Sequence, residues 1–302
     1  MLTDDVRRSA EARGAAGAAW IESLPGIVAH FRDAWSLTIG ESLPGGKAAL
    51  VLRVGSAGAD AVLKIAPPDS GFAAEVAAIA AADGYGYVRL LAADLDRNAA
   101  LLEALGRPLA YATDSPEEQL DLLTATLIAA WRATKPPPTG WHRAAALAEY
   151  CEELWADLGR PCPRALLDRA LDYARRRLAS HAPTVLCHGD PHIGNALAVL
   201  VPRPGAASGY VFVDPDGFSC EPAYDLGVTV RSYTSQVLAD GDPVALVRGW
   251  CDRLAAATGG DRQAIWEWGF IERVSTGLHM IRYGHPVEGR AHLASAERLL
   301  PR

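Results

Sequence analysis

The spacing of apolar residues changes about a third of the way along the chain, and this change constrains the fold more than any other feature. From Trp35 to Ala66, apolar and polar residues alternate in three short runs, WSLTIGESL, ALVLRVG and AVLKIA, separated by glycine-containing turns. This period of two predicts an antiparallel meander of three strands. After Gly106 and Pro108, leucine and alanine recur at three- and four-residue spacing, which predicts long helices.

The remaining segments also divide into a strand-rich first third and a mainly helical remainder. The alanine-rich stretch 71–82 predicts a helix, and 87–94 and 99–105 predict two further strands. Helices are expected over 116–134, 141–158 and 163–180, strands within 184–190 and 210–217, and helices again in the final third. We therefore expect an α+β fold in two lobes. Residues 1–105 form a small antiparallel sheet with one helix and an N-terminal helical segment, residues 106–302 form a larger, mainly helical lobe, and a cleft lies between them.

The composition excludes several classes of protein. Half of the 302 residues are hydrophobic and 22% are charged, an ordinary globular balance that excludes a disordered or fibrous chain. The 36 acidic and 29 basic residues give a net charge of -7, whereas nucleic-acid-binding proteins usually show a basic excess. The N-terminal run lacks the features of a secretion signal, and no apolar stretch approaches the roughly 20 residues that cross a bilayer. We expect a cytoplasmic monomer with neither a nucleic-acid nor a membrane partner.

The cysteines indicate neither a disulfide framework nor a zinc site. They are odd in number, widely spaced and without a C-x-x-C pair: Cys151, Cys162, Cys187, Cys220 and Cys251. Buried, reduced thiols are therefore expected.

The strongest chemical signal is HGDPHIGN at 188–195, followed by VDPDG at 213–217. Asp190 and Asn195 stand five residues apart after one predicted strand, and Asp214 follows another. Phosphoryl transfer needs one carboxylate that orients the acceptor hydroxyl and oxygen ligands that hold Mg²⁺ against nucleotide phosphates. On this interpretation Asp190 is catalytic, while Asn195 and Asp214 bind the metal. The alternative is that the same residues only form Asx turns and a β-turn.

Longer runs resemble a known family. The segments 19–35 (AWIESLPGIVAHFRDAW), 87–105 and 213–227 are similar to aminoglycoside phosphotransferases, in particular to the streptomycin 6-kinase or aminoglycoside and hydroxyurea resistance kinase group. The resemblance implies a protein-kinase-like fold and ATP or GTP as phosphoryl donor with Mg²⁺. It also implies that Lys64 contacts the nucleotide phosphates, that Glu75 holds this lysine, and that Glu103 to Leu105 is the connector whose backbone binds the base. Alternatively, Lys64 and Glu75 lie on solvated surfaces.

The chain departs from the protein-kinase pattern in two places. Pro44-Gly45-Gly46-Lys47, which should cover the phosphates, is neither a P-loop nor a G-x-G-x-x-G loop and is also a common hairpin sequence. Gly189 stands where protein kinases have the arginine of H-R-D, and only 11 residues separate Asp214 from Asp225. An activation segment therefore has little room. We expect Asp225 to anchor the catalytic loop and His188 to pack beneath it, and the role of His192 stays open.

The sequence predicts the acceptor-binding residues less specifically than the catalytic motif. A polycationic antibiotic needs convergent carboxylates, and the candidates are Asp216, Glu221, Glu267 and Glu272, each of which could instead be a surface residue. The leading hypothesis is phosphorylation of an aminoglycoside, with streptomycin at its 6-hydroxyl as the main candidate. The alternatives are hydroxyurea, another antibiotic, or a metabolite such as choline or a sugar alcohol. A non-catalytic nucleotide-binding regulator is the alternative of a different class.

Overall fold

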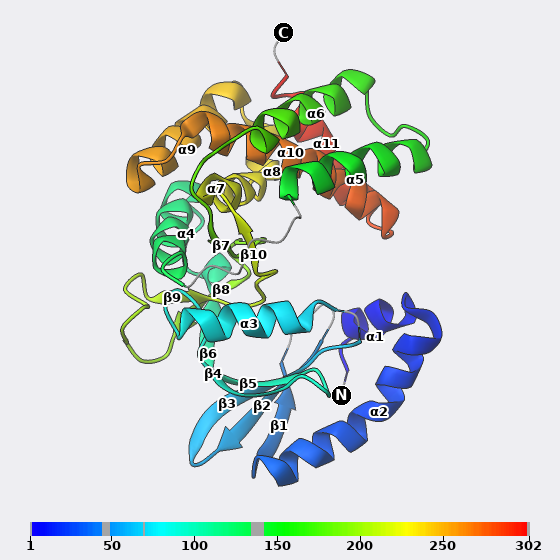
Figure 1. Ribbon diagram of the computed structural model, residues 1–302, viewed down its shortest axis with the longest axis vertical. Coiled ribbons are helices and arrows are strands. Elements are labelled where there is room, and N and C mark those ends of the chain that lie inside the picture. Colours follow the sequence, from blue (N-terminus) through cyan, green and yellow to red (C-terminus); the bar gives the residue numbers. More distant parts are fainter. Residues whose placement is uncertain (1, 44–48, 69, 134–141, 301–302) are drawn as a thin grey trace.

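A small sheet and a larger group of helices make up the chain (Figure 1). The computed structural model describes residues 2–43, 49–68, 70–133 and 142–300. The sheet is antiparallel, with strand order β1-β2-β3-β5-β4. Its strands are β1 (Thr38–Ser42), β2 (Leu50–Ser56), β3 (Ala59–Ile65), β4 (Leu90–Asp94) and β5 (Ala99–Glu103). The predicted meander and the two further strands are confirmed, whereas the predicted phosphate loop at 44–47 lies outside the described residues.

Helices cover both faces of this sheet. Alternate side chains of β3 point to opposite faces, so Leu63 and Ile65 pack with Trp20 and Phe31 of α2 (Gly14–Ala34). On the other face, Val62 belongs to the cluster that contains the buried side chains of α3 (Phe72–Ala82). Figure 1 shows α2 and α3 on opposite sides of the sheet, with the short α1 (Asp4–Glu11) beside α2. The sequence predicted the N-terminal helical segment but placed only one helix on the sheet.

The larger part is built around one buried helix, α10 (Arg262–Arg282). This helix contacts α5, α6, α7, α9 and α11, and almost every residue from Ala264 to Ser275 is buried. The surrounding helices are α4 (Pro116–Ala130), α5 (Arg143–Asp157), α6 (Arg164–Leu178), α7 (Pro222–Arg231), α8 (Thr234–Ala239), α9 (Pro243–Thr258) and α11 (Pro286–Glu297). The long helices predicted after Gly106 are confirmed, with ends a few residues shorter than expected.

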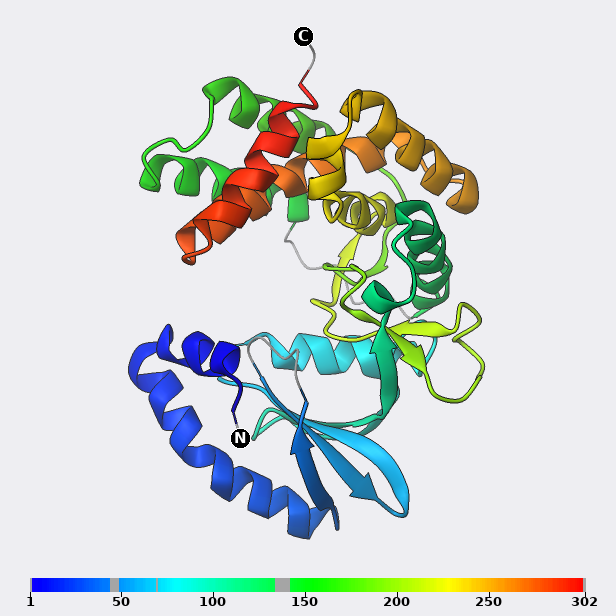
Figure 2. The same cartoon turned by 180° about the vertical axis from the view of Figure 1, so that it is seen from behind.

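Short strands carry the two motif turns, at 188–195 and 213–217, between the two parts. The strands β6 (Leu105–Pro108), β8 (Ala196–Val199) and β9 (Tyr210–Phe212) form one sheet, and β7 (Val185–Cys187) pairs with β10 (Phe218–Cys220). The 3-10 helix η1 (Leu109–Tyr111) follows β6. β7 and β9 were predicted because they lie within the apolar runs TVLC and YVFV, whereas β6, β8 and β10 were not predicted as separate strands. Figure 2 shows these strands from behind, between the sheet and the helices.

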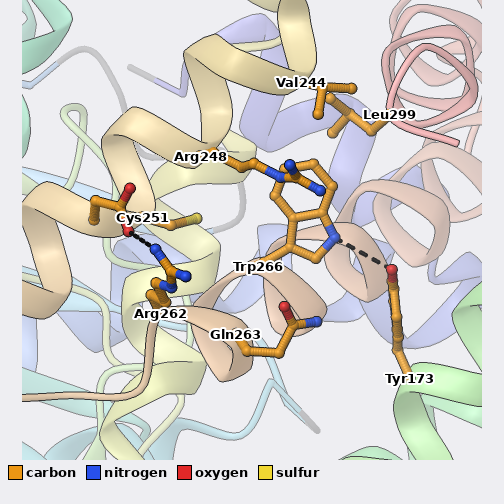
Figure 3. Close-up of a pocket in the computed structure, with 9 residues that line it drawn as sticks. Tyr173, Val244, Arg248, Cys251, Arg262, Gln263, Trp266 and Leu299 are labelled. Atoms are coloured by element: carbon orange, nitrogen blue, oxygen red, sulfur yellow. Dashed lines mark hydrogen bonds and ion pairs between the residues drawn. The ribbon is translucent and has the colours of Figure 1, made fainter. Parts of the chain in front are cut away.

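A cavity of about 410 Å³ lies among α6, α9 and α10 (Figure 3). There the Trp266 indole lies under the guanidinium of Arg248, and its Nε1 is 3.3 Å from the hydroxyl of Tyr173. Cys251 also lines this cavity.

All five cysteines are buried and free, as predicted. No helix in the described part of the chain has both the length and the apolar character needed to cross a membrane.

Candidate active site

The backbone brings the two predicted motifs side by side. The loop from His188 to Asn195 connects β7 to β8, and the next turn begins where β9 ends at Phe212. The Val213 amide donates to the Asn195 carbonyl at 2.9 Å, and the Asp216 amide donates to the His188 carbonyl at 2.7 Å. Within the first loop, Nδ2 of Asn195 donates to the Asp190 carbonyl at 3.1 Å. Asp190, Asn195 and the Asp214 turn therefore occupy one region of the molecule.

Lys64 joins the sheet to this region. Its ammonium lies 2.6 Å from Oε1 of Glu75 on α3 and 2.7 Å from Oδ1 of Asp214. Burial alone would lower the pKa of Lys64, but the two carboxylates outweigh burial and raise this pKa. The lysine is therefore a charged group that strand β3, helix α3 and the Asp214 turn hold in one position.

Asp190 is held by an arginine that the sequence analysis did not single out. Nη2 of Arg231, the last residue of α7, donates to Oδ1 of Asp190 at 2.6 Å, and Nε2 of His192 lies 3.4 Å from Oδ2. Burial would raise the pKa of Asp190, but Arg231 reverses this effect and holds the pKa well below its ordinary value. The side chain still has 41% of its surface exposed, so a charged carboxylate faces the solvent-accessible space beside it.

Buried residues support the loop from below. The Asp225 carboxylate accepts hydrogen bonds from the amides of His188 and Gly189 at 2.9 and 3.0 Å, and from the Trp131 indole at 2.9 Å. His188 is fully buried, its Nδ1 accepts from the Asp190 amide, and its Nε2 lies 2.9 Å from the Val213 carbonyl. Burial lowers the pKa of His188, which favours the neutral ring. Both residues thus occupy the structural positions expected for them.

Gly189 is required where the two turns meet. Its φ of +96° lies in a region that L side chains rarely adopt, and an added Cβ would come within 2.5 Å of Oδ2 of Asp216. The absence of a side chain therefore lets the Asp216 carboxylate lie directly against the backbone beside Asp190.

A cavity of about 870 Å³ opens next to Asp190. Residues from the 188–195 loop, from the Asp214 turn and from α5, α7, α10 and α11 line it, among them Asp190, His192, Asp216, Arg143, Arg231, Glu272, His279 and His292. This cavity is wide enough for a drug-sized acceptor. His192, whose role the sequence left open, thus faces the cavity.

The charged groups in this cavity are not all equally available to a ligand. Glu272 accepts from the Tyr224 hydroxyl at 2.7 Å and lies 3.5 and 3.6 Å from the guanidinium groups of Arg143 and Arg231. The carboxylate of Asp216, by contrast, has no hydrogen bond or ion pair within the described part of the chain. Burial, together with Asp190 and Glu272, raises the pKa of Asp216 to about 6, against the opposing effect of Arg143. Asp216 is therefore the carboxylate that a bound cation could pair with.

The structure does not bring two of the four predicted acceptor residues to this cavity. Glu267 lies 2.7 Å from Nε of Arg177 on α6, and Glu221 lies 3.6 Å from the same guanidinium. Glu221 also accepts from the Trp268 indole at 2.8 Å. Both glutamates are buried and serve to join α6, α10 and the start of α7, so their placement near the motifs along the chain does not make them neighbours of Asp190. Asp216 and Glu272 do line this cavity.

The predicted connector lies where the sheet meets the helical part. Glu103 ends β5 and Leu105 begins β6. The Glu103 carboxylate accepts from the Arg89 amide at 2.8 Å and pairs with the guanidinium of Arg203, which also donates to the carbonyls of Gly84 and Tyr87. The Glu103 carboxylate is already paired with the Arg89 amide and the Arg203 guanidinium. A nucleotide base could therefore be contacted only by the backbone of this segment.

The donor set fits magnesium. Oδ1 of Asn195 and the second oxygen of Asp214 are hard oxygen donors, which Mg²⁺ prefers. In the described part of the chain, no group of three or more histidines, cysteines, aspartates and glutamates is arranged to hold a metal ion. Asn195 and Asp214 therefore suit a metal whose other ligands are water and phosphate oxygens, and not a metal enclosed by protein.

Comparison with known proteins identifies the family. The model of the family "Aminoglycoside/hydroxyurea antibiotic resistance kinase" matches residues 34–284. The chain belongs to this family. It is 29% identical to the streptomycin 6-kinase of Streptomyces glaucescens over 297 residues, covering 96% of this chain and 94% of that one. It is 32% identical to the hydroxyurea phosphotransferase of Kitasatospora aureofaciens over 304 residues, covering 96% of this chain and 82% of the relative. The chain is therefore a phosphotransferase with an alcohol group as acceptor, and the resemblance stated from the motifs is confirmed.

Solved structures show the same fold. A thermostable form of aminoglycoside phosphotransferase APH(4)-Ia in complex with ADP and hygromycin B has a TM-score of 0.63, at 11% identity and 90% and 98% coverage of the two chains. Aminoglycoside phosphotransferase APH(3'')-Id from Streptomyces rimosus, in complex with ADP and streptomycin, has a TM-score of 0.55, at 18% identity and 84% and 98% coverage. These likenesses confirm the protein-kinase-like α+β fold. Family membership argues against the alternative of a non-catalytic regulator.

Proposed function

We propose that this kinase transfers the γ-phosphoryl group of ATP or GTP to a hydroxyl of an aminoglycoside, and that the acceptor is streptomycin at its 6-hydroxyl. The observation that supports this acceptor best is the pair of carboxylates on either side of Gly189. Asp190 is held by Arg231, whereas the Asp216 carboxylate forms no hydrogen bond or ion pair with a described residue and feels Arg143 only as a nearby charge. One carboxylate is thus placed to orient a hydroxyl and the other to bind a cationic group of the same molecule.

The nucleotide side of the site uses residues 1–105 and the Asp214 turn. We assign Lys64 to the donor phosphates, with Glu75 holding its side chain extended. Asn195 and Asp214 would hold Mg²⁺, which neutralises charge that develops on the phosphate oxygens. The backbone of Glu103 to Leu105 would bind the base. The helical part, residues 106–302, carries the catalytic loop and the acceptor cavity.

Asp190 acts on the acceptor hydroxyl. Because Arg231 keeps its pKa low, Asp190 is a carboxylate at neutral pH and is a weak base. A weak base suffices for phosphoryl transfer, because the transition state is loose and the proton leaves the hydroxyl late. Asp190 therefore orients the hydroxyl towards phosphorus and accepts its proton as the new bond forms, so no phosphorylated enzyme intermediate is needed.

Asp216 and Glu272 have different relations to the acceptor. Glu272 already forms ion pairs with Arg143 and Arg231 and accepts a hydrogen bond from Tyr224. It therefore forms part of the cavity wall and does not bind the cationic group of the acceptor. Asp216 lies against the backbone of Gly189, next to Asp190, and can form a charge-assisted hydrogen bond with a guanidinium or ammonium group. A cationic group adjacent to the acceptor hydroxyl would thus be recognised beside Asp190.

Hydroxyurea is the second candidate acceptor, because one relative at 32% identity is named a hydroxyurea phosphotransferase. Hydroxyurea is small and uncharged, so it would gain little from Asp216 and would fill only part of the cavity of about 870 Å³. Asp216 therefore separates the two acceptors experimentally. Other antibiotics, choline and sugar alcohols belong in the same screen.

The test measures ADP or GDP release with Mg²⁺ and each acceptor, for the wild-type enzyme, Asp216→Asn and a control, Asp252→Asn. Asp252 forms an exposed ion pair with Arg262, away from Asp190. We expect Asp216→Asn to lower kcat/KM for streptomycin by about 30-fold or more, as the loss of a charged contact predicts. Turnover of hydroxyurea should change little. Activity on hydroxyurea alone, or equal kcat/KM for streptomycin in wild type and Asp216→Asn, would refute the proposed acceptor.

Two further parts of the proposal concern the state of the protein. We propose that it acts as a monomer in the cytoplasm, where ATP, GTP and Mg²⁺ are available. Light scattering at assay concentrations tests the oligomeric state, and a mass of twice 32.0 kDa would contradict it.

A further inference from the structure

Arg273 is a buried cation without a carboxylate partner. It lies on α10 with none of its surface exposed, and no ion pair links it to any carboxylate in the described part of the chain. Burial and the neighbouring Arg231 lower the pKa of Arg273 to about 9. Because a buried, unpaired charge is costly, other contacts must compensate for it.

Those contacts lie at the C-terminal end of α7. Nη2 of Arg273 donates to the Val230 carbonyl at 2.7 Å, and Nη1 donates to the Arg231 carbonyl at 3.2 Å. These are the carbonyls of the last two residues of α7. A guanidinium at this position adds donors to these carbonyls, which also accept from the Tyr233 amide and the Thr234 hydroxyl, and it complements the negative end of the helix dipole. The hydroxyls of Thr234 and Ser295 accept from the same Nη1.

The crossing of α7 and α10 fixes this arrangement. A Cβ on Gly227 of α7 would lie 2.6 Å from the Gly269 amide nitrogen of α10, so the two helix backbones touch there. Arg231 and Arg273 each lie four residues, or about one helical turn, beyond this point. The close contact between the backbones of α7 and α10 at Gly227 and Gly269 therefore places the Arg273 side chain at the C-terminal end of α7.

α7 in turn holds the catalytic loop at two points. Asp225, in its first turn, accepts from the amides of His188 and Gly189. Arg231, its last residue, donates to Oδ1 of Asp190. The six-residue step from Asp225 to Arg231 spans roughly 9 Å along the helix axis. The position of the α7 end thus determines where the Arg231 guanidinium meets Asp190.

We propose that Arg273 is a positioning residue for phosphoryl transfer, which fixes Arg231 against Asp190 by holding the last carbonyls of α7. This inference rests on the catalytic role proposed for Asp190. Arg273 contacts no residue assigned to the nucleotide, so its removal should alter turnover and not nucleotide binding.

The primary test compares Arg273→Met, Arg273→Lys and a matched control, Arg298→Met. Arg298 donates to the carbonyls of Val237, Leu238 and Asp240 at the end of α8, a helix without a contact to Asp190. With rates normalised to the folded fraction, Arg273→Met should lower kcat at least about tenfold with the nucleotide KM changed by less than about twofold. Arg273→Lys should restore part of kcat, because a lysine can still donate to one carbonyl. Arg298→Met should retain kcat within about twofold.

A double-mutant cycle and a crystal structure test the route through Arg231. If Arg273 acts through Arg231, adding Arg273→Met to Arg231→Met should change kcat by less than about twofold, whereas independent effects would multiply. In crystals of Arg273→Met, or of Arg273→Lys if the methionine variant does not fold, the Arg231 to Asp190 contact of 2.6 Å should be lost or displaced.

The outcomes separate this inference from the proposed function. Unchanged kcat in folded Arg273→Met, multiplicative losses in the double variant, or an intact Arg231 to Asp190 contact would overturn the positioning role. If Asp190→Asn retains full turnover, or if wild type phosphorylates no acceptor, the proposed function fails. The crystal structure still decides in that case whether Arg273 places Arg231.

Discussion

Asp225→Asn tests whether α7 determines the conformation of the catalytic loop. The carboxylate receives three donors, since Oδ2 accepts from the His188 amide and the Trp131 indole, and Oδ1 accepts from the Gly189 amide. An asparagine keeps the shape but offers one acceptor oxygen, and its NH₂ group must face one of these donors. The backbone of residues 188 and 189 should then shift, and the carboxylate of Asp190 shifts with it.

The size of the effect follows from these contacts. One buried amide left without an acceptor costs about 1–3 kcal/mol, and weakening the other two bonds from charge-assisted to neutral costs about 0.5–1 kcal/mol each. Relief from burying the charge offsets part of this cost, because burial raises the pKa of Asp225. We therefore expect Asp225→Asn to lower the free energy of unfolding by about 2–4 kcal/mol and to lower kcat by about tenfold to a thousandfold.

Urea denaturation and steady-state kinetics measure the two effects, and Trp131→Phe is the control. Phenylalanine removes the indole donor but leaves the two loop amides bonded to Asp225, so it should cost about 1 kcal/mol and leave kcat within about twofold. The reasoning is refuted if folded Asp225→Asn turns over at the wild-type rate. It is also refuted if Trp131→Phe lowers kcat as much as Asp225→Asn does.

Three other changes have equally specific outcomes. Gly189→Ala should lower kcat at least about tenfold, because its Cβ meets Asp216, whereas Gly259→Ala, with positive φ but no nearby atom, should only reduce stability by about 1 kcal/mol in thermal unfolding. Burial and two arginines lower the pKa of His292 to about 4, so the native state resists protonation and loses stability as the pH falls from about 6.5 to 4. His292→Gln should flatten this dependence by up to about 3 kcal/mol in urea melts. Asp214→Asn should raise the Mg²⁺ concentration at half-maximal turnover about tenfold or more, and an unchanged titration would remove Asp214 from the metal.

The proposed nucleotide side of the site rests on local patterns for its strand and loops, and on the family resemblance for the roles of Lys64 and Glu75. The alternation in AVLKI puts Lys64 on the face opposite Leu63 and Ile65, and that face packs on α3, which carries Glu75. The spacing in HGDPHIGN likewise predicts one loop after a strand. Periodicity and turn chemistry thus predict the strand and the loop, whereas the pairing of Lys64 with Glu75 was implied by the resemblance.

The acceptor side depends on how distant helices cross, which the sequence alone does not fix. Glu267 and Glu272 are five residues apart on α10, about 140° around the helix axis, so Glu267 meets Arg177 of α6 while Glu272 faces the cavity. Arg231 meets Asp190 only because α7 runs beneath the catalytic loop. Pro25, followed by a glycine, would ordinarily indicate a break, yet it lies inside α2, where packing on the sheet outweighs local preference.

The arrangement around Asp190 also explains how this kinase functions without the arginine of H-R-D. Gly189 occupies that position, and its lack of a side chain admits the Asp216 carboxylate. The arginine beside Asp190, the proposed catalytic carboxylate, comes from α7 as Arg231. Between Asp214 and Arg231 the chain forms β10 and then enters α7 at Pro222, so a folded strand and helix stand where a switchable activation segment would lie. Because packed elements supply the cation at Asp190, the folded chain itself orients this carboxylate.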